Sequence, residues 1–266
     1  MAGFGLGSPG EGGLLVSLSL AALADLAEEE GRGTVELFAP RVRFRSVGHS
    51  DLDACLDWFA ELVMTVDIDD ADDVVVGSLD FTVIRLGTAD PIALCLDQFD
   101  GDHEILAGLF DGNQLTQQVE EQFETLTVVT EAVLIPNIAF VTEPLRGHDL
   151  GLWLVAETIH RMLPTGMVLT WPYPADCTGP DPGPDSDPDA DSAQITALDS
   201  AIGRLADHFG RCGLTPVESA PWALGMSTTF EALPVARSRL GAVRSTAVSL
   251  TLEQLRAASA PPAPDE

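Results

Sequence analysis

Lysine is absent from this sequence. The 13 basic residues are all arginine and face 42 aspartate and glutamate residues, which gives a formal net charge of -29. A field of that sign repels nucleic-acid phosphates and anionic lipid surfaces, so we expect no nucleic-acid and no membrane partner. Without lysine, a phosphate-binding loop of the GxxxxGK(S/T) type is excluded. The negative charge can attract a cationic amine, although solubility in a crowded cytoplasm explains it as well.

Cysteine is also scarce. The four cysteines (Cys55, Cys95, Cys177 and Cys212) form no CxxC pair and show no metal-ligand spacing with histidine. We therefore expect reduced thiols, no disulfide framework and no metal site. The glycine-rich start lacks a basic segment, and the apolar stretch over residues 14–27 is short for a membrane span. A cytoplasmic location is expected.

Apolar periodicity divides the chain into three parts. Residues 1–33 are expected to form a flexible segment and a helix, residues 34–232 an α/β (α+β) domain, and residues 233–266 a C-terminal tail. Within the domain, the stretch over 176–193 is rich in proline and aspartate and is expected to be an exposed, disordered loop.

The same reading predicts the elements of the domain. Strands are expected at 35–47, 74–76, 81–86, 92–96, 166–171 and 222–230, helices at 50–63, 103–110, 116–123, 152–163 and 194–212, and a strand pair or a bulged strand around Pro136 at 126–142.

The junction before the helix at 152–163 carries the functional signal. A glycine-containing turn between a strand and a helix points backbone N–H groups at one place, and the helix dipole adds to them. Gly147 and Gly151 let the backbone approach an anion closely, and Arg146 can add a charge-assisted contact. The pattern predicts a pyrophosphate site.

Two segments resemble landmarks of the GNAT superfamily of acyl-CoA N-acyltransferases. FVTEPLRGHDLGLWLVAETIHRML is similar to its cofactor motif, often written RGxGLG, with Arg146, Gly147, Leu150 and Gly151 on the pattern. LADHFGRCGLTPV resembles the second landmark, a helix ending in FYxxxGF, with Gly213 on its glycine. VLTWPYPAD resembles the strand before that helix in many members, and its YPAP-like ending is similar to that of an actinobacterial group. The resemblance covers residues 74–230, most clearly 133–217.

The resemblance implies a central mixed sheet flanked by helices, with an N-terminal extension. It also implies an acetyl-CoA-dependent N-acetyltransferase, with acetyl-CoA as co-substrate and a small-molecule or peptide amine as acceptor. The oligomeric state stays open, a homodimer being one alternative. The expected cofactor contacts are Val141, Arg146, Gly147, His148, Asp149, Leu150, Gly151 and Phe209.

Two residues depart from the family pattern. Asp149 stands where the family usually has its central glycine, and Phe209 stands where many members have a proton-donating tyrosine. No glutamate lies well inside the strand before the loop, so the candidates for handling the amine proton are Asn137, through a water, and Glu131. These departures keep a second hypothesis open, a catalytically degenerate GNAT-fold protein with a binding or regulatory role.

Overall fold

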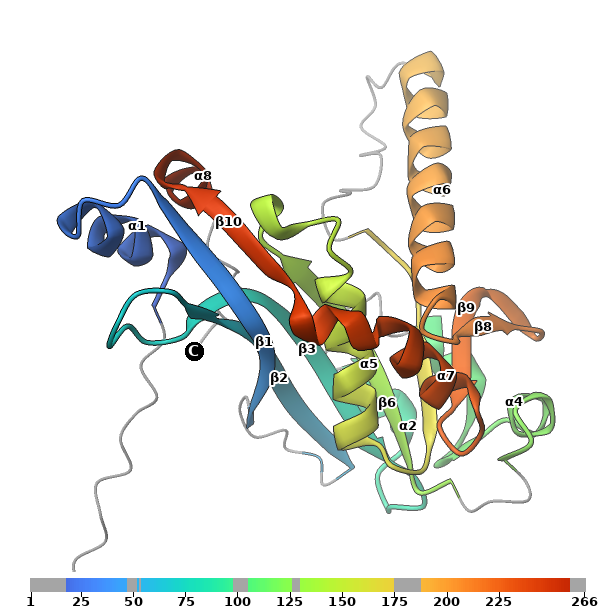
Figure 1. Cartoon of the computed structure of the whole chain (residues 1–266). Helices are drawn as coiled ribbons and strands as arrows, with labels where there is room; N and C mark the ends of the chain where they lie inside the picture. The colour runs from blue at the N-terminus through green and yellow to red at the C-terminus, as the bar shows by residue number, and fades with distance from the viewer. Residues whose placement is uncertain are drawn as a thin grey trace, which may run out of the picture.

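The computed structural model describes residues 18–46, 52, 54–97, 105–125, 130–174 and 188–258 (Figure 1). Residues 1–17 of the expected flexible segment, Cys177 and residues 176–187 of the expected disordered loop lie outside the described residues.

An eight-stranded sheet organises the described residues, in the order β10-β1-β2-β3-β6-β7-β9-β8. Neighbouring strands are antiparallel except β6 and β7, which are parallel. The sheet is therefore mixed and mostly antiparallel. Its strands are β1 (Thr34–Ser46), β2 (Cys55–Val66), β3 (Val74–Arg85), β6 (Ala132–Val141), β7 (Met167–Thr170), β8 (Thr215–Val217), β9 (Ala220–Ser227) and β10 (Ala247–Thr251).

Helices cover both faces of this sheet. The α-helices are α1 (Leu20–Glu29), α2 (Ile92–Asp97), α4 (Gln117–Gln122), α5 (Leu150–Met162), α6 (Pro188–Gly210), α7 (Ala232–Arg239) and α8 (Leu252–Ala257). The 3-10 turns are η1 (Ile105–Leu109), η3 (Glu143–Leu145) and η4 (Leu240–Ser245), and a hairpin joins β4 (Phe110–Asp111) to β5 (Gln114–Leu115). None of the helices in the described ranges has the length and apolar composition needed to cross a membrane.

Successive strand residues feed two separate cores, as the period of two in a β-strand requires. Leu134 belongs to the core on the face that α1, α5, α7 and α8 cover, whereas Val133 and Ile135 belong to the core on the face of α2, η1 and α4. The C-terminal end of α6 joins the first core through Phe209, and its N-terminal part projects beyond the sheet (Figure 1).

The expected bulged strand around Pro136 is confirmed. The register between β3 and β6 shifts so that Phe81 pairs with Pro136 and Asp80 with Ile138, which makes Asn137 the extra residue. β6 pairs with β7 only near its start, at Val133 and Leu134. β7 ends at Thr170, whose hydroxyl donates to the carbonyl oxygen of Pro136, while β6 runs on beside β3 to Val141. The last residues of β6 therefore extend past the end of β7.

The helix predicted at 50–63 is wrong, because Cys55–Val66 is strand β2 and residues 50, 51 and 53 lie outside the described residues. β2 is a central strand that contributes apolar side chains to both cores. The apolar residues of such a strand do not alternate, so their spacing in the sequence cannot distinguish a strand from a helix. The segment forms a strand because it pairs with β1 along one edge and with β3 along the other.

The strand predicted at 92–96 is also wrong, because Ile92–Asp97 is the short helix α2. Ile92, Cys95 and Leu96 are buried at helical spacing, and Pro91 precedes the first turn, where its missing N–H costs nothing. The strands predicted at 74–76 and 81–86 are parts of one strand, β3.

The C-terminal residues are more ordered than the tail we expected. α7, η4, β10 and α8 occupy residues 232–257, and β10 pairs with β1 at the edge of the sheet. Upstream, α6 begins at Pro188, so residues 188–193 are helical and do not belong to a loop. The helices at 116–123 and 152–163 and the strands at 35–47, 166–171 and 222–230 are confirmed within a few residues.

Candidate functional site

The loop between β6 and α5 brings most of the predicted cofactor residues together. It is anchored at Thr142, whose N–H and hydroxyl both donate to the carbonyl oxygen of Val76, at 3.0 and 3.1 Å. Arg146 then turns back on the strand, and its Nε donates to the carbonyl oxygen of Val141 at 3.0 Å. Its guanidinium carbon lies 5.9 Å from the centre of the Phe140 ring, within cation–π range. Arg146 is thus exposed but held at the end of β6.

Glycine is required where this loop turns and where α5 meets β6. Gly147 has a φ of +85°, a conformation that L side chains rarely adopt. A Cβ atom on Gly151 would lie 3.2 Å from Cγ2 of Val141, a tight contact that shows how closely α5 approaches the strand here. His148 is exposed on the loop, whereas Leu150 is buried and anchors the first turn of α5.

The first turn of α5 offers unused hydrogen-bond donors. The helix begins after Asp149, whose carbonyl oxygen accepts from the N–H of Trp153 at 2.9 Å. The N–H groups of Leu150, Gly151 and Leu152 therefore have no intrahelical acceptor. The Asp149 side chain does not cap them. Donors of this kind, together with the helix dipole, favour an anion.

Asp149 is neutralised from a distant part of the chain. Its two carboxylate oxygens accept from Nη1 and Nη2 of Arg211, at 2.8 and 2.7 Å. Hydrogen bonds from Arg211 hold the pKa of Asp149 below its ordinary value. Arg211 follows the last turn of α6, where Gly213 reverses the chain with a φ of +96°. The carboxylate in the loop is thus ionised and paired, and Arg146 is not its partner.

Two ring side chains on α6 lie beside this pair. His208 is half-buried, and burial, followed by the charge of Arg211, lowers its pKa, so it is neutral at neutral pH. Phe209 is buried in the first core, with its ring centre 6.4 Å from that of His208. It has no hydroxyl to donate to a departing thiolate.

Asn137 belongs to a hydrogen-bonded chain across three strands. Its Nδ2 donates to Oγ1 of Thr82 at 3.3 Å, and that hydroxyl donates to Oδ1 of Asp57, also at 3.3 Å. Asn137 lies four residues before Val141, about 13 Å along the strand. Polar groups therefore lie at the bulge of β6, close to the end of β7.

Glu131 lies away from this arrangement. It is exposed before the start of β6, ten residues and about 33 Å of extended chain from Val141. The structure thus groups Arg146, Gly147, His148, Asp149, Leu150 and Gly151 with Val141 at one end of β6, and leaves Glu131 at the other.

Arg211, Thr82 and Asp57 were missed in the sequence. Arg211 lies inside LADHFGRCGLTPV, two residues before Gly213. The resemblance singled out Phe209 and Gly213 in this segment but assigned no role to Arg211. No sequence motif marks Thr82 or Asp57, because the register of β2, β3 and β6 determines their contacts.

Neither a scan against models of known protein families nor a search of curated proteins finds a match for this chain. The functional argument therefore depends on the geometry above.

Proposed function

We propose that this protein is an acetyl-CoA-dependent N-acetyltransferase of the GNAT type acting on an amine. The observation that carries the proposal is the loop at Arg146–Gly151, which presents N–H groups without an intrahelical acceptor and an arginine, at the end of a strand that extends past its parallel neighbour. The order strand, glycine loop, helix, strand, helix, strand is the one that the resemblance implies.

The charges of the site support the binding of a pyrophosphate. The carboxylate of Asp149 would repel phosphate if it were unpaired. Its bidentate ion pair with Arg211 neutralises that negative charge. Arg146 and the first turn of α5 then supply the positive groups of the loop, which also carries the exposed carboxylate of Glu143. In this proposal the pyrophosphate contacts the N–H groups of Gly151 and Leu152, and Arg146 supplies a further charge-assisted contact.

The chemistry that follows is the attack of a neutral amine on a thioester. A bond forms between the nitrogen and the acyl carbon, the carbon–sulfur bond breaks, and the proton lost by the amine passes to the CoA thiolate. Positioning of the two reactants supplies most of the rate. Asn137 is the residue we assign to orient a water near the amine, with Thr82 and Asp57 holding its side chain.

A second candidate is a GNAT-fold protein that binds a partner or ligand without catalysis. The pairing of Asp149 with Arg211 favours it, because the loop already contains an internal anion bound to an arginine. The burial of Phe209 points the same way, since it supplies packing and no proton donor.

Calorimetric titration with acetyl-CoA tests the proposal. We expect micromolar binding that Arg146→Ala weakens at least tenfold, because it removes a charge-assisted contact of about 1.5–3 kcal/mol. Arg204→Ala is the matched control, since Arg204 is exposed on α6 and, among the described residues, its side chain bonds only Ser200. An absence of heat and of thermal stabilisation at millimolar acetyl-CoA would exclude the enzyme.

Asp149→Asn in the same titration separates the two candidates. Asparagine tolerates the φ of +57° at this position and removes the carboxylate. If the site binds pyrophosphate, Arg211 becomes available to it and acetyl-CoA binds more tightly. If the site is closed to CoA, the substitution leaves the titration flat.

A further inference from the structure

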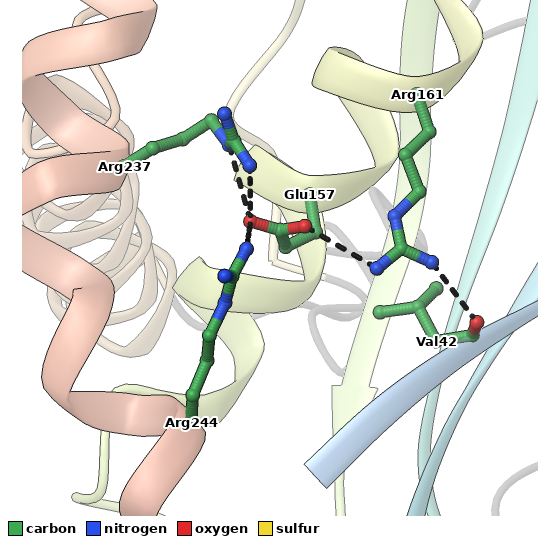
Figure 2. A network of polar contacts seen from close by, with 5 residues as sticks. All are labelled: Val42, Glu157, Arg161, Arg237 and Arg244. Atoms are coloured by element: carbon green, nitrogen blue, oxygen red, sulfur yellow. Dashed lines mark hydrogen bonds and ion pairs between the residues drawn. The ribbon is translucent and has the colours of Figure 1, made fainter.

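A second cluster of charges lies on α5, two turns beyond the loop. Glu157 is buried, with 3% of its side chain exposed, and three arginines from different elements converge on it. Arg237 donates from Nε and Nη2 to Oε1 at 3.1 and 2.9 Å, and Arg244 donates to the same oxygen at 3.0 Å. Arg161 donates to Oε2 at 3.4 Å (Figure 2).

The cluster carries more positive charge than its carboxylate neutralises. Burial raises the pKa of Glu157, but hydrogen bonds from Arg237 and Arg244 outweigh it and leave the pKa below its ordinary value, so Glu157 is ionised. Three guanidinium groups and one carboxylate leave a local charge of +2. In the part of the chain that the structure describes, no other carboxylate forms an ion pair with these arginines.

This excess is unusual among the ion pairs of the described residues. Arg32 contacts two acids, Glu30 and Asp67, and Arg211 has a carboxylate of its own. Elsewhere among the described residues, at most two arginines share one carboxylate, as Arg41 and Arg43 share Asp73.

Two of the three guanidinium groups have donors to spare and are open to solvent. The side chains of Arg161 and Arg244 are 44% and 57% exposed. A guanidinium group has five N–H donors. Among the described residues, Arg244 forms hydrogen bonds only through Nη2, and Arg161 only through its two Nη atoms, one of them 3.4 Å from the carbonyl oxygen of Val42. In Figure 2, Arg161 and Arg244 lie on either side of Glu157.

We infer that Arg161, Arg237 and Arg244 form a binding site for a phosphate-type oxyanion, either inorganic phosphate or the phosphate of a small monoester. A phosphate near pH 7.5 carries close to two negative charges, which matches the excess of +2. Its oxygens suit the planar fork of guanidinium donors. Glu157 neutralises only one of the three guanidinium charges. A bound phosphate would also reduce the repulsion among these guanidinium groups.

The site is distinct from the acyl-CoA loop. Glu157 lies eight residues after Asp149, about 12 Å along the helix axis. Its partners come from α7 and η4, whereas those of the loop come from β6 and the end of α6. Phosphate binding therefore stands or fails independently of the proposed acetyltransferase.

Thermal unfolding with sodium phosphate at pH 7.5 tests the site, with sodium chloride holding the ionic strength constant. We expect the midpoint to rise with phosphate concentration and to saturate, and Arg161→Gln or Arg244→Gln to weaken the apparent affinity about tenfold. Arg239→Gln is the matched control, an exposed arginine on the same helix as Arg237. Glycerol 2-phosphate replaces phosphate in a parallel series.

Glu157→Gln should change the response to phosphate in the opposite direction to the Arg161→Gln and Arg244→Gln substitutions. It should lower the midpoint without phosphate, because three arginines lose their partner, and enlarge the rise that phosphate produces, because the local charge increases. Binding of both anions assigns the site to monoesters and free phosphate, and binding of phosphate alone assigns it to the free ion. A rise no larger than chloride produces, or equal responses of the Arg161→Gln and Arg239→Gln variants, overturns the proposal.

Discussion

At the residue scale, the candidate site depends on one contact that spans 62 positions of the sequence, between Asp149 and Arg211. The pair sets the charge of the loop and also acts on its neighbour. Since Arg211 is held beside His208, its charge adds to burial in disfavouring the protonated imidazole. The loop, the end of α6 and the protonation of His208 are therefore coupled.

His208 makes the stability of the protein depend on pH. Its pKa in the folded chain lies below the unfolded value of about 6.5, so between the two values the unfolded chain binds more protons. Stability should therefore fall as the pH falls below about 6.5, and a tenfold difference in proton affinity corresponds to about 1.4 kcal/mol. Urea unfolding at pH 7.5 and pH 5.5 should show a smaller loss in His208→Gln than in the unmodified protein.

His160→Gln serves as the control for this measurement. His160 is exposed near the end of α5, so its substitution should leave the pH dependence unchanged. An equal loss of stability in the His208→Gln variant and the unmodified protein would assign the pH dependence to other groups.

The sequence locates the residues of the loop better than it locates their partners. Arg146, Gly147 and Gly151 follow a local motif, and a strand-to-helix turn places them wherever that turn forms. Arg211 contributes through a tertiary contact, which no spacing along the chain reveals. The prediction for Glu131 relied on its closeness to β6 in the sequence. The strand runs away from Glu131 toward the loop, so that closeness does not bring the two together.

At the element scale, the end of β6 that carries the loop is set by its contact with β3. Gly77 faces Val141 in this pairing, and a Cβ atom on Gly77 would lie only 2.6 Å from the carbonyl oxygen of Phe140 and 3.3 Å from Cδ2 of Leu62. Backbone cannot move aside as a flexible side chain can. The missing side chain thus lets the two strands approach just before the loop.

Gly77→Ala should separate the strands and destabilise the fold. Overpacking of this kind costs about 1–3 kcal/mol, and urea unfolding measures it as a lower midpoint at unchanged slope. Gly203→Ala is the matched control, because Gly203 lies in α6 with open space around its Cβ position. That substitution should stabilise the protein by up to about 1 kcal/mol. Equal effects of the two variants would contradict the steric argument.

Length decided which of these elements the apolar spacing could predict. α5 was predicted because its spacing of three and four persists over 13 residues and Pro164 follows it, although residues 152–159 are all buried. β2 was predicted wrongly because both of its faces are buried, and α2 because six residues are too few for a period to show. β10 escaped prediction because it is short and mostly exposed, and its pairing with β1 defines it.

At the scale of the whole molecule, charge is the dominant feature. Each of the 13 arginines can neutralise one carboxylate, so at least 29 of the 42 acidic groups remain unbalanced. The described arginines sit mainly where they join elements, as Arg256 joins α8 to Glu28 of α1 and Arg237 joins α7 to α5. The positive charges thus hold the fold together while the rest of the surface repels itself.

Screening should therefore stabilise this protein. The compact state concentrates the unbalanced carboxylates, and raising the ionic strength from 10 mM to 0.1 M shortens the Debye length from about 30 Å to about 10 Å. The thermal midpoint should rise by a few degrees over this range of sodium chloride, since about 1 kcal/mol corresponds to roughly 2–4 °C for a chain of this size. Potassium chloride should give the same rise, because the effect depends on ionic strength. A midpoint that falls with salt would mean that the ion pairs between elements outweigh the repulsion across the surface.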